Sequence, residues 1–152
     1  MFFAPVLGYV PRRVFSRDEA EAMLPHVRAT LRTLRSLRQG LEEAEELVRD
    51  AESYYGEAVD TEANPERATF RRHCAQRDAV RDGFAESLRG FADEGVELKD
   101  LDRGLVDFPH RRDGAVVYLC WVEGEAGIGH WHPLETGFAG RQALPDGPTA
   151  GL

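Results

Sequence analysis

The sharpest pattern of ligand-type side chains in the sequence is His130-Trp131-His132. Residues two apart on a β-strand face the same side, so both imidazoles can reach one metal ion while Trp131 packs on the other face. A third ligand must come from a neighbouring strand or turn, and the acids best placed for it are Glu125, Asp107 and Glu97. Imidazole and carboxylate ligands suit Zn, Mn or Fe. The pattern predicts a divalent metal site centred on His132, with hydrogen-bonded structural histidines as the alternative.

A second group of charged side chains is formed by Lys99, Asp102 and Arg141, with Asp100 and Arg103 beside them. Arg141 follows a Gly-Phe-Ala-Gly loop, from which a guanidinium can hold a carboxylate or phosphate through two parallel hydrogen bonds. The group therefore predicts an anion-binding or polar site. A structural network that fixes the loop is the alternative.

Nucleophilic catalysis finds little support in the sequence. Cys120 lies in an apolar strand pattern where burial raises the pKa of a thiol, and no GxSxG turn is present. The spacing Gly137-x-x-Gly140 lacks the Lys and Ser or Thr of a phosphate-binding loop. Cys74 and Cys120 do not form a CxxC pair, so both are predicted to be buried, reduced packing residues.

Two long helices must position these groups. Ser16 and Glu19 form a capping-box pattern that predicts a helix from Arg17 to about residue 54, with a kink at Pro25. A second helix is predicted at about 66–94, ending at Gly95 in a left-handed cap. Each carries an apolar stripe with a spacing of three and four residues, typical of coiled-coil packing. The loop between them predicts an antiparallel hairpin.

The pattern changes to a period of two after Gly95, which predicts a β-meander over about 96–132. The expected strands are 96–101, 105–108, 115–122 and 128–132, with hairpin turns at 113–114 and 124–127. The segment 115–122 is apolar on both faces and is placed centrally. The prediction is an α+β fold in which a kinked helical hairpin packs on an antiparallel meander. A single domain is expected over 15–144, with an irregular arm at 1–14, a C-terminal loop at 133–144 and a flexible tail at 145–152.

The charge balance argues against a nucleic-acid partner. The 152-residue chain has 19 Lys and Arg against 27 Asp and Glu, a net charge of −8, which is the wrong sign for phosphate binding. A basic stripe from Arg28 to Arg38 is the exception and leaves an anionic partner open. The hairpin offers a structural explanation, since folding back places the acidic stretch Glu42–Glu46 beside the basic stretch Arg67–Arg72.

The N-terminal residues lack the basic leader and cleavage site of a signal peptide. No stretch approaches the roughly 20 apolar residues of a membrane-spanning helix. We therefore expect a cytoplasmic protein that does not bind a membrane.

Several motifs resemble a known family. They are the run Gly95 to Pro109, Leu119-Cys120-Trp121, Gly124-Glu125, Trp131-His132, Gly137-Phe-Ala-Gly-Arg141, Phe15-Ser16 and Leu24-Pro25. Together they resemble the bacterial family called domain of unknown function 2203, over about residues 14–144. The resemblance implies no particular substrate, cofactor or reaction.

Two functions follow from these patterns. The first is a non-enzymatic, dimeric interaction or scaffold module that uses the coiled-coil-like hairpin to bind a second copy or another protein. The alternative is a small metal-binding protein or metal-dependent enzyme with the site at His132. The sequence does not decide whether the protein is an enzyme.

Overall fold

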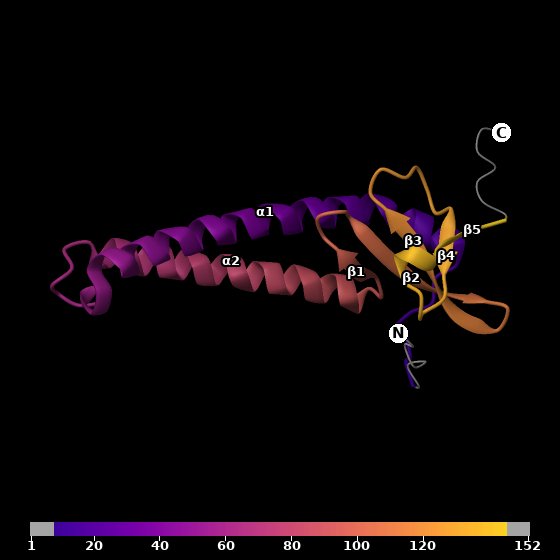
Figure 1. The fold of residues 1–152 in the computed structure, drawn as a ribbon, viewed down its shortest axis with the longest axis horizontal. Helices are drawn as coiled ribbons and strands as arrows, with labels where there is room; N and C mark the ends of the chain where they lie inside the picture. Colours follow the sequence, from indigo (N-terminus) through magenta and orange to yellow (C-terminus); the bar gives the residue numbers. More distant parts are fainter. Residues whose placement is uncertain (1–7, 146–152) are drawn as a thin grey trace. The chain divides into compact units, whose positions relative to one another are not determined.

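The computed structural model describes residues 8–145. Their contacts form two compact units, one made of residues up to Leu31 and from Arg89 onward, the other of Arg32–Leu88. The elements in chain order are α1 (Arg17–Tyr55), η1 (Gly56–Ala58), α2 (Arg67–Asp93), β1 (Glu97–Asp100), β2 (Leu105–Arg112), β3 (Ala115–Val122), β4 (His130–His132), η2 (Phe138–Gly140) and β5 (Gln142–Ala143) (Figure 1). Two helices and an antiparallel sheet confirm the α+β class.

The predicted arm is described only from residue 8. Residues 8–16 contain neither helix nor strand. The rest of the arm, residues 1–7, and the predicted flexible tail beyond residue 145 lie outside the described residues. The single domain predicted for 15–144 stays a prediction.

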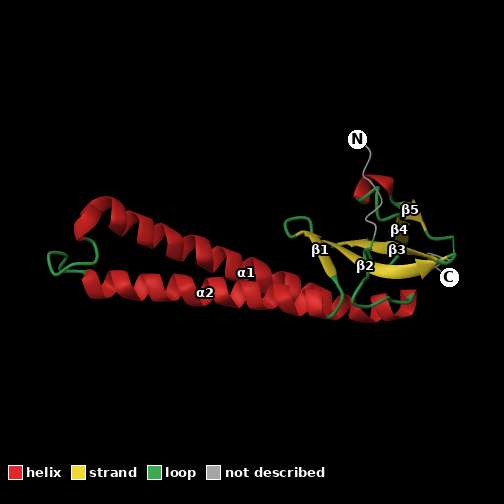
Figure 2. Ribbon diagram, turned by 90° about the horizontal axis from the view of Figure 1, so that it is seen from below, coloured by secondary structure: helices red, strands yellow, loops and turns green. Residues whose placement is uncertain are grey.

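In the unit Arg32–Leu88, α1 and α2 pack side by side in opposite directions (Figure 2). The two helices contact each other at their glycines: a Cβ added at Gly40 would lie 3.7 Å from Val80, and one at Gly83 would lie 3.5 Å from Leu37, both ordinary van der Waals distances. A step forward along α1, from Leu37 to Gly40, is matched by a step back along α2, from Gly83 to Val80, as an antiparallel pair requires. The apolar stripe of α1 is buried at Leu34, Ala44 and Val48. The packed helical hairpin therefore agrees with the sequence pattern.

The connection between the helices is held by Asn64, which is only 3% exposed. Its amide nitrogen donates to the carbonyl of Val59, and its amide oxygen accepts from the backbone N–H of Glu66, both at 2.8 Å. A buried amide with both ends bonded fixes the path of the loop into α2.

The predicted charge pairing across the hairpin is wrong in its register. Arg67 and Arg71 both bind Asp60 in the connecting loop, at 3.0 and 2.7 Å, instead of the acidic stretch Glu42–Glu46. Glu45 instead lies 3.9 Å from Arg81, farther along α2. The loop supplies its own carboxylate because it folds back close to the first turns of α2. These exposed pairs each contribute about 0–1 kcal/mol.

In the other unit, the start of α1 has the predicted capping box. The backbone N–H of Glu19 donates to the Ser16 hydroxyl, and the backbone N–H of Ser16 donates to the Glu19 carboxylate, both at 3.1 Å. α1 continues through Pro25, and the predicted kink there stays a prediction.

The end of α2 has the predicted left-handed cap at Gly95, whose φ is +87°. The N–H of Val96 donates to the carbonyl of Phe91, and that of Gly95 to Ala92, the two bonds of a Schellman motif. Glycine is required twice over, because an added Cβ would lie 2.8 Å from the Cβ of Arg13.

The five strands form one antiparallel sheet in the order β1-β2-β3-β4-β5. β3 matches the predicted strand 115–122 and has the central place in the sheet. Asp113 and Gly114 form the tight turn between β2 and β3, with φ of +50° and +79°, as a type I′ hairpin requires.

The other strands differ in length from the predictions. β2 continues to Arg112 through Pro109, because β1 pairs only with Leu105–Asp107 and leaves that side of β2 without a strand partner. There the carbonyl of Pro109 accepts from the N–H of Phe15 at 2.7 Å. β4 is shorter than 128–132, since the N–H of Ile128 donates to the Glu21 carboxylate and not to a strand. β5 was not predicted.

One face of the sheet packs against the first turns of α1 and the end of α2. The shared core is Phe15, Ala20, Leu24, Val27, Leu31, Phe91, Val96, Val106, Phe108, Leu119, Trp121 and Ile128. Within the described residues, neither helix is apolar over a length that could cross a membrane.

Candidate metal centre

The face of the sheet opposite the core carries a row of polar side chains. Glu97 pairs with Asp107, Asp107 with Cys120, and Cys120 with His130. Directly paired residues point to the same face, and alternation places their neighbours Val106, Leu119 and Trp121 in the core. Four adjacent strands thus contribute one potential ligand each to a single row.

Asp107 and His132 form a buried pair at the centre of this face. His132 Nε2 lies 3.0 Å from Asp107 Oδ2, and the side chains are 2% and 3% exposed. His132 Nδ1 lies 2.8 Å from the carbonyl of Pro133, which can only accept, so Nδ1 carries a proton. Burial lowers the pKa of His132, but the bonds to Asp107 and Pro133 outweigh it and raise the pKa overall. His132 therefore donates from Nδ1 to Pro133 and turns Nε2 toward the Asp107 carboxyl group.

Cys120 lies against the same carboxylate. One ligand atom from each of Asp107, Cys120 and His132 lies within 4.8 Å of the others, and all three residues are buried. Burial first, and the charge of Asp107 next, raise the pKa of the Cys120 thiol to about 12. Asp107 Oδ1 is buried and has no hydrogen-bond partner among the described residues. A buried carboxylate oxygen without a hydrogen bond lowers the stability of the fold, and a cation bound at this point would supply the missing partner.

The structure separates the residues that the sequence grouped as metal ligands. Asp107 and His132 come together, whereas His130 and Glu125 meet elsewhere, with His130 Nδ1 3.3 Å from the Glu125 carboxylate. Arg141 donates to both of them. Glu125 also accepts from the backbone N–H of Val122 at 2.8 Å, so it closes the turn after β3.

Sequence reasoning missed Cys120 as a potential ligand, although the signal was present. A two-residue turn at Asp113-Gly114 fixes the register of β2 and β3, and counting back from it places residue 107 opposite residue 120. The apolar neighbours of Cys120 concealed this pairing.

The predicted polar group is divided as well. Lys99 binds Glu97 at 3.0 Å and lies over the ring of Tyr118, 4.8 Å from its centroid. Arg103 and Arg141 instead lie over the ring of Phe138, 4.3 and 4.9 Å from its centroid. An anion clamp formed jointly by Lys99, Asp102 and Arg141 stays a prediction, and Lys99 and Arg141 bind different carboxylates, those of Glu97 and Glu125.

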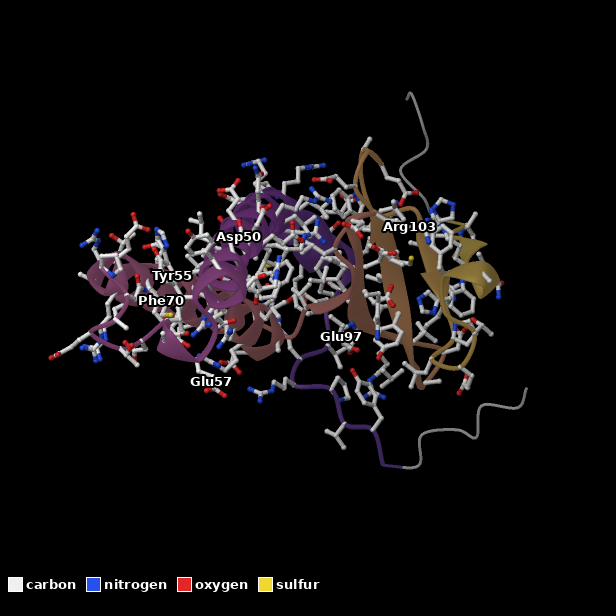
Figure 3. The ribbon with its side chains drawn as sticks, turned by 60° about the vertical axis from the view of Figure 1, so that its left-hand side comes forward. Asp50, Tyr55, Glu57, Phe70, Glu97 and Arg103 are labelled. Atoms are coloured by element: carbon white, nitrogen blue, oxygen red, sulfur yellow. The ribbon has the colours of Figure 1, made fainter. Side chains whose placement is uncertain are left out.

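Glu97, labelled in Figure 3, accepts a hydrogen bond from Tyr118, whose ring lies 5.4 Å from that of His132 in the buried pair. Tyr118 donates to it at 2.8 Å, and Tyr9 donates to its other carboxylate oxygen. Burial raises the pKa of Glu97, but the bonds from Tyr9, Lys99 and Tyr118 outweigh it and lower the pKa overall. Burial and the bond to Glu97 raise the pKa of Tyr9 to about 12. Glu97 is thus an ionised carboxylate whose two oxygens already accept hydrogen bonds from Tyr9, Tyr118 and Lys99.

The fold and this site define a helical-hairpin and antiparallel-sheet protein with a buried Asp–Cys–His group. The chain belongs to the family described as "Uncharacterized conserved protein (DUF2203)", whose model matches residues 13–144. This match confirms the resemblance seen in the sequence. No curated protein and no solved structure matches the chain.

Proposed function

We propose that the protein binds a divalent metal ion through Asp107, Cys120 and His132. The observation that carries this proposal is the buried oxygen Asp107 Oδ1, which has no partner among the described residues and lies beside two further ligand-type side chains. An ion-paired Asp and His alone would leave that oxygen unsatisfied.

The donor set favours zinc or iron over manganese. One carboxylate, one imidazole and one thiol combine harder and softer ligands, whereas Mn prefers oxygen. A tetrahedral zinc ion with bonds of about 2.0–2.3 Å spaces its ligand atoms about 3.3–3.8 Å apart. The three atoms lie within 4.8 Å already, so small side-chain movements suffice. The bond from His132 Nδ1 to Pro133 is the kind of contact that aims Nε2 at a metal.

Metal binding requires the group to lose protons. The proton shared between His132 Nε2 and Asp107 Oδ2 must leave, and the Cys120 thiol must ionise. The ion would be shielded from solvent, because all three ligands are buried. We therefore propose that its first effect is to stabilise the sheet.

The test is zinc binding to untagged protein, reconstituted under reducing conditions and measured by elemental mass spectrometry and by competition with a chromophoric chelator. We expect about one zinc ion per chain in the wild type and in the matched control Cys74→Ala. Cys120→Ala keeps the Asp107–His132 pair and should bind at least about 10-fold more weakly. His130→Ala should bind as the wild type does. A metal-free wild type, or equal binding by Cys120→Ala, would refute the site.

We propose a second role for the hairpin, as an interaction surface for a second copy of the chain or another protein. Leu47 and Tyr54 support it, since their side chains are 47% and 83% exposed and aromatic anchors are common in interfaces. Light scattering coupled to size exclusion would give twice the mass of one chain for a dimer. A single-chain mass across the micromolar range would contradict dimerisation.

We also propose that the protein works in the cytoplasm. Cys74 and Cys120 are both free thiols, which suits a reducing compartment. Cell fractionation with an antibody against the protein tests this location.

A further inference from the structure

A cavity of about 460 Å³ lies in the helical hairpin, near its connecting loop. The residues that determine its character are Leu47, Asp50, Tyr54, Tyr55, Glu66 and Phe70. Asp50, Tyr55 and Phe70 are labelled in Figure 3. All belong to the unit Arg32–Leu88. Its volume falls in the range of small-molecule sites, about 300–1,000 Å³. The metal centre, which belongs to the other unit, does not involve any of these residues.

Aromatic rings form much of the wall. Tyr54 and Tyr55 meet edge to face, with centroids 4.8 Å apart at 78°, and Phe70 is buried beside them. Tyr54 is 83% exposed although it is a large aromatic side chain. Elsewhere in the described residues, Arg or Lys covers the rings of Phe15, Tyr118, Trp121, Trp131 and Phe138. These cation–π pairs do not include Tyr54, Tyr55 or Phe70, and of these three rings that of Tyr54 is the one exposed to a cation from outside.

The charged groups of the wall are negative. Asp50 and Glu66 line the cavity together with His73, whereas no Lys or Arg does. Of the nearby arginines, Arg67 and Arg71 are held by Asp60, and Arg72 donates to the hydroxyl of the lining residue Thr69 at 2.9 Å. The charge of Glu66 reaches the rings, because burial first and Glu66 next raise the pKa of Tyr55.

The surrounding sequence strengthens this negative field. Residues 41–66 contain ten acids and one Arg, whereas residues 67–90 contain three acids and six Arg, so the stretch 41–90 keeps 13 acids against seven Arg. Such a concentration of one sign attracts counter-ions to the cavity and raises their local concentration. Carboxylates beside uncovered aromatic faces are the combination that recognises alkylammonium and guanidinium groups.

We infer that this cavity binds an organic cation, an ammonium or guanidinium group carried on an apolar body. The charged group lies near Asp50 and Glu66, and the apolar body packs against Leu47, Tyr55 and Phe70. The ligand is either a free amine or a basic side chain presented by a partner protein. The cavity accepts both through the same chemistry.

The test is an NMR titration of the ¹⁵N-labelled full chain with three probes of similar shape and different charge. They are 2-phenylethylammonium, 2-phenylethanol and 3-phenylpropionate. The cation should give saturable shifts of amide signals within residues 47–73, and the alcohol should bind at least about 10-fold more weakly. The propionate should give no saturable shift. Equal binding of the alcohol, or no saturation by the cation up to about 10 mM, would overturn the inference.

Variants locate the binding in the cavity. Asp50→Asn with Glu66→Gln should weaken 2-phenylethylammonium binding at least about 10-fold. Glu57→Gln is the matched control, because Glu57 lies in the same acidic stretch but does not line the cavity, and it should change the affinity less than about 2-fold. Both carboxylates are exposed, so the variants should fold. Equal effects of the control and the double variant would also overturn the inference.

A fourth probe, N-acetyl-Leu-Arg-amide, distinguishes the source of the cation. Tighter binding of this peptide than of 2-phenylethylammonium supports a basic side chain from a partner. Tighter binding of the amine supports a free ligand.

Discussion

Replacing Asp107 with Ala should destabilise the metal-free protein strongly. The carboxylate and its partner His132 are almost completely buried, at 3% and 2% exposure, and are 3.0 Å apart. Breaking a buried pair by removing one partner costs about 3–5 kcal/mol, because the other polar group stays in the interior without compensation. For a chain of this length, 1 kcal/mol corresponds to about 2–4 °C. We therefore expect the melting temperature to fall by about 6–20 °C.

The assay is thermal unfolding followed by circular dichroism in the presence of a chelator, so that metal binding does not contribute. Glu135→Ala is the control, because Glu135 is an exposed acid near the same end of the sheet, and surface changes usually stay within about 0.5 kcal/mol. A double variant, Asp107→Leu with His132→Leu, should lose less stability than Asp107→Ala alone, since it leaves no orphaned polar group. A loss of less than about 1 kcal/mol for Asp107→Ala would refute the buried-pair reasoning.

Two further changes test the caps and the network. Gly95→Ala should lower the free energy of unfolding in urea by about 2 kcal/mol or more, because an L side chain is strained at φ +87° and would meet Arg13. Gly90→Ala is the control: inside α2 the added methyl group meets no atom within 4 Å, and the free energy of unfolding should rise by about 0.5–1 kcal/mol. Tyr118→Phe should cost about 1.5–3 kcal/mol at pH 7, since it removes a donor to the ionised Glu97. Because the folded pKa of Glu97 is lowered, this stabilisation is present above about pH 4.3 and is lost as pH falls through the folded pKa. The difference between variant and wild type should therefore shrink in urea unfolding at pH 3.

The fold could be predicted mainly from short sequence motifs. The capping box at Ser16 and Glu19, the left-handed cap at Gly95 and the turn at Asp113-Gly114 each depend on a few adjacent residues, and the structure has all three. β5 has only two residues, too few for a periodic pattern to register. The end of β2 was misjudged because the tolerance for Pro109 depends on the length of another strand.

The candidate site was predicted less completely than the fold. Asp107 and His132 were both named as candidate ligands, but their contact joins β2 and β4 on either side of β3, and no short motif encodes it. His130 shares a strand with His132, yet its nearest charged groups come from Glu125 and Arg141. Alternation along a strand predicts the face on which a side chain lies. It does not predict which of two neighbouring clusters on that face the side chain joins.

The tight turn at Asp113-Gly114 sets the register between β2 and β3, and with it the side chains that make up the polar row. With two residues in the loop, Asp107 lies opposite Cys120, and Val106 lies opposite Trp121 in the core. An added residue in this loop would move the pairing by one position. Asp107 would then lie opposite Leu119 or Trp121 instead of Cys120, and the polar side chains of the two strands would no longer share a face. The length of this loop therefore decides, together with the residue types, which side chains meet at the proposed metal site. In any chain with this fold, the spacing from this turn to the acid and to the cysteine is the feature to compare first.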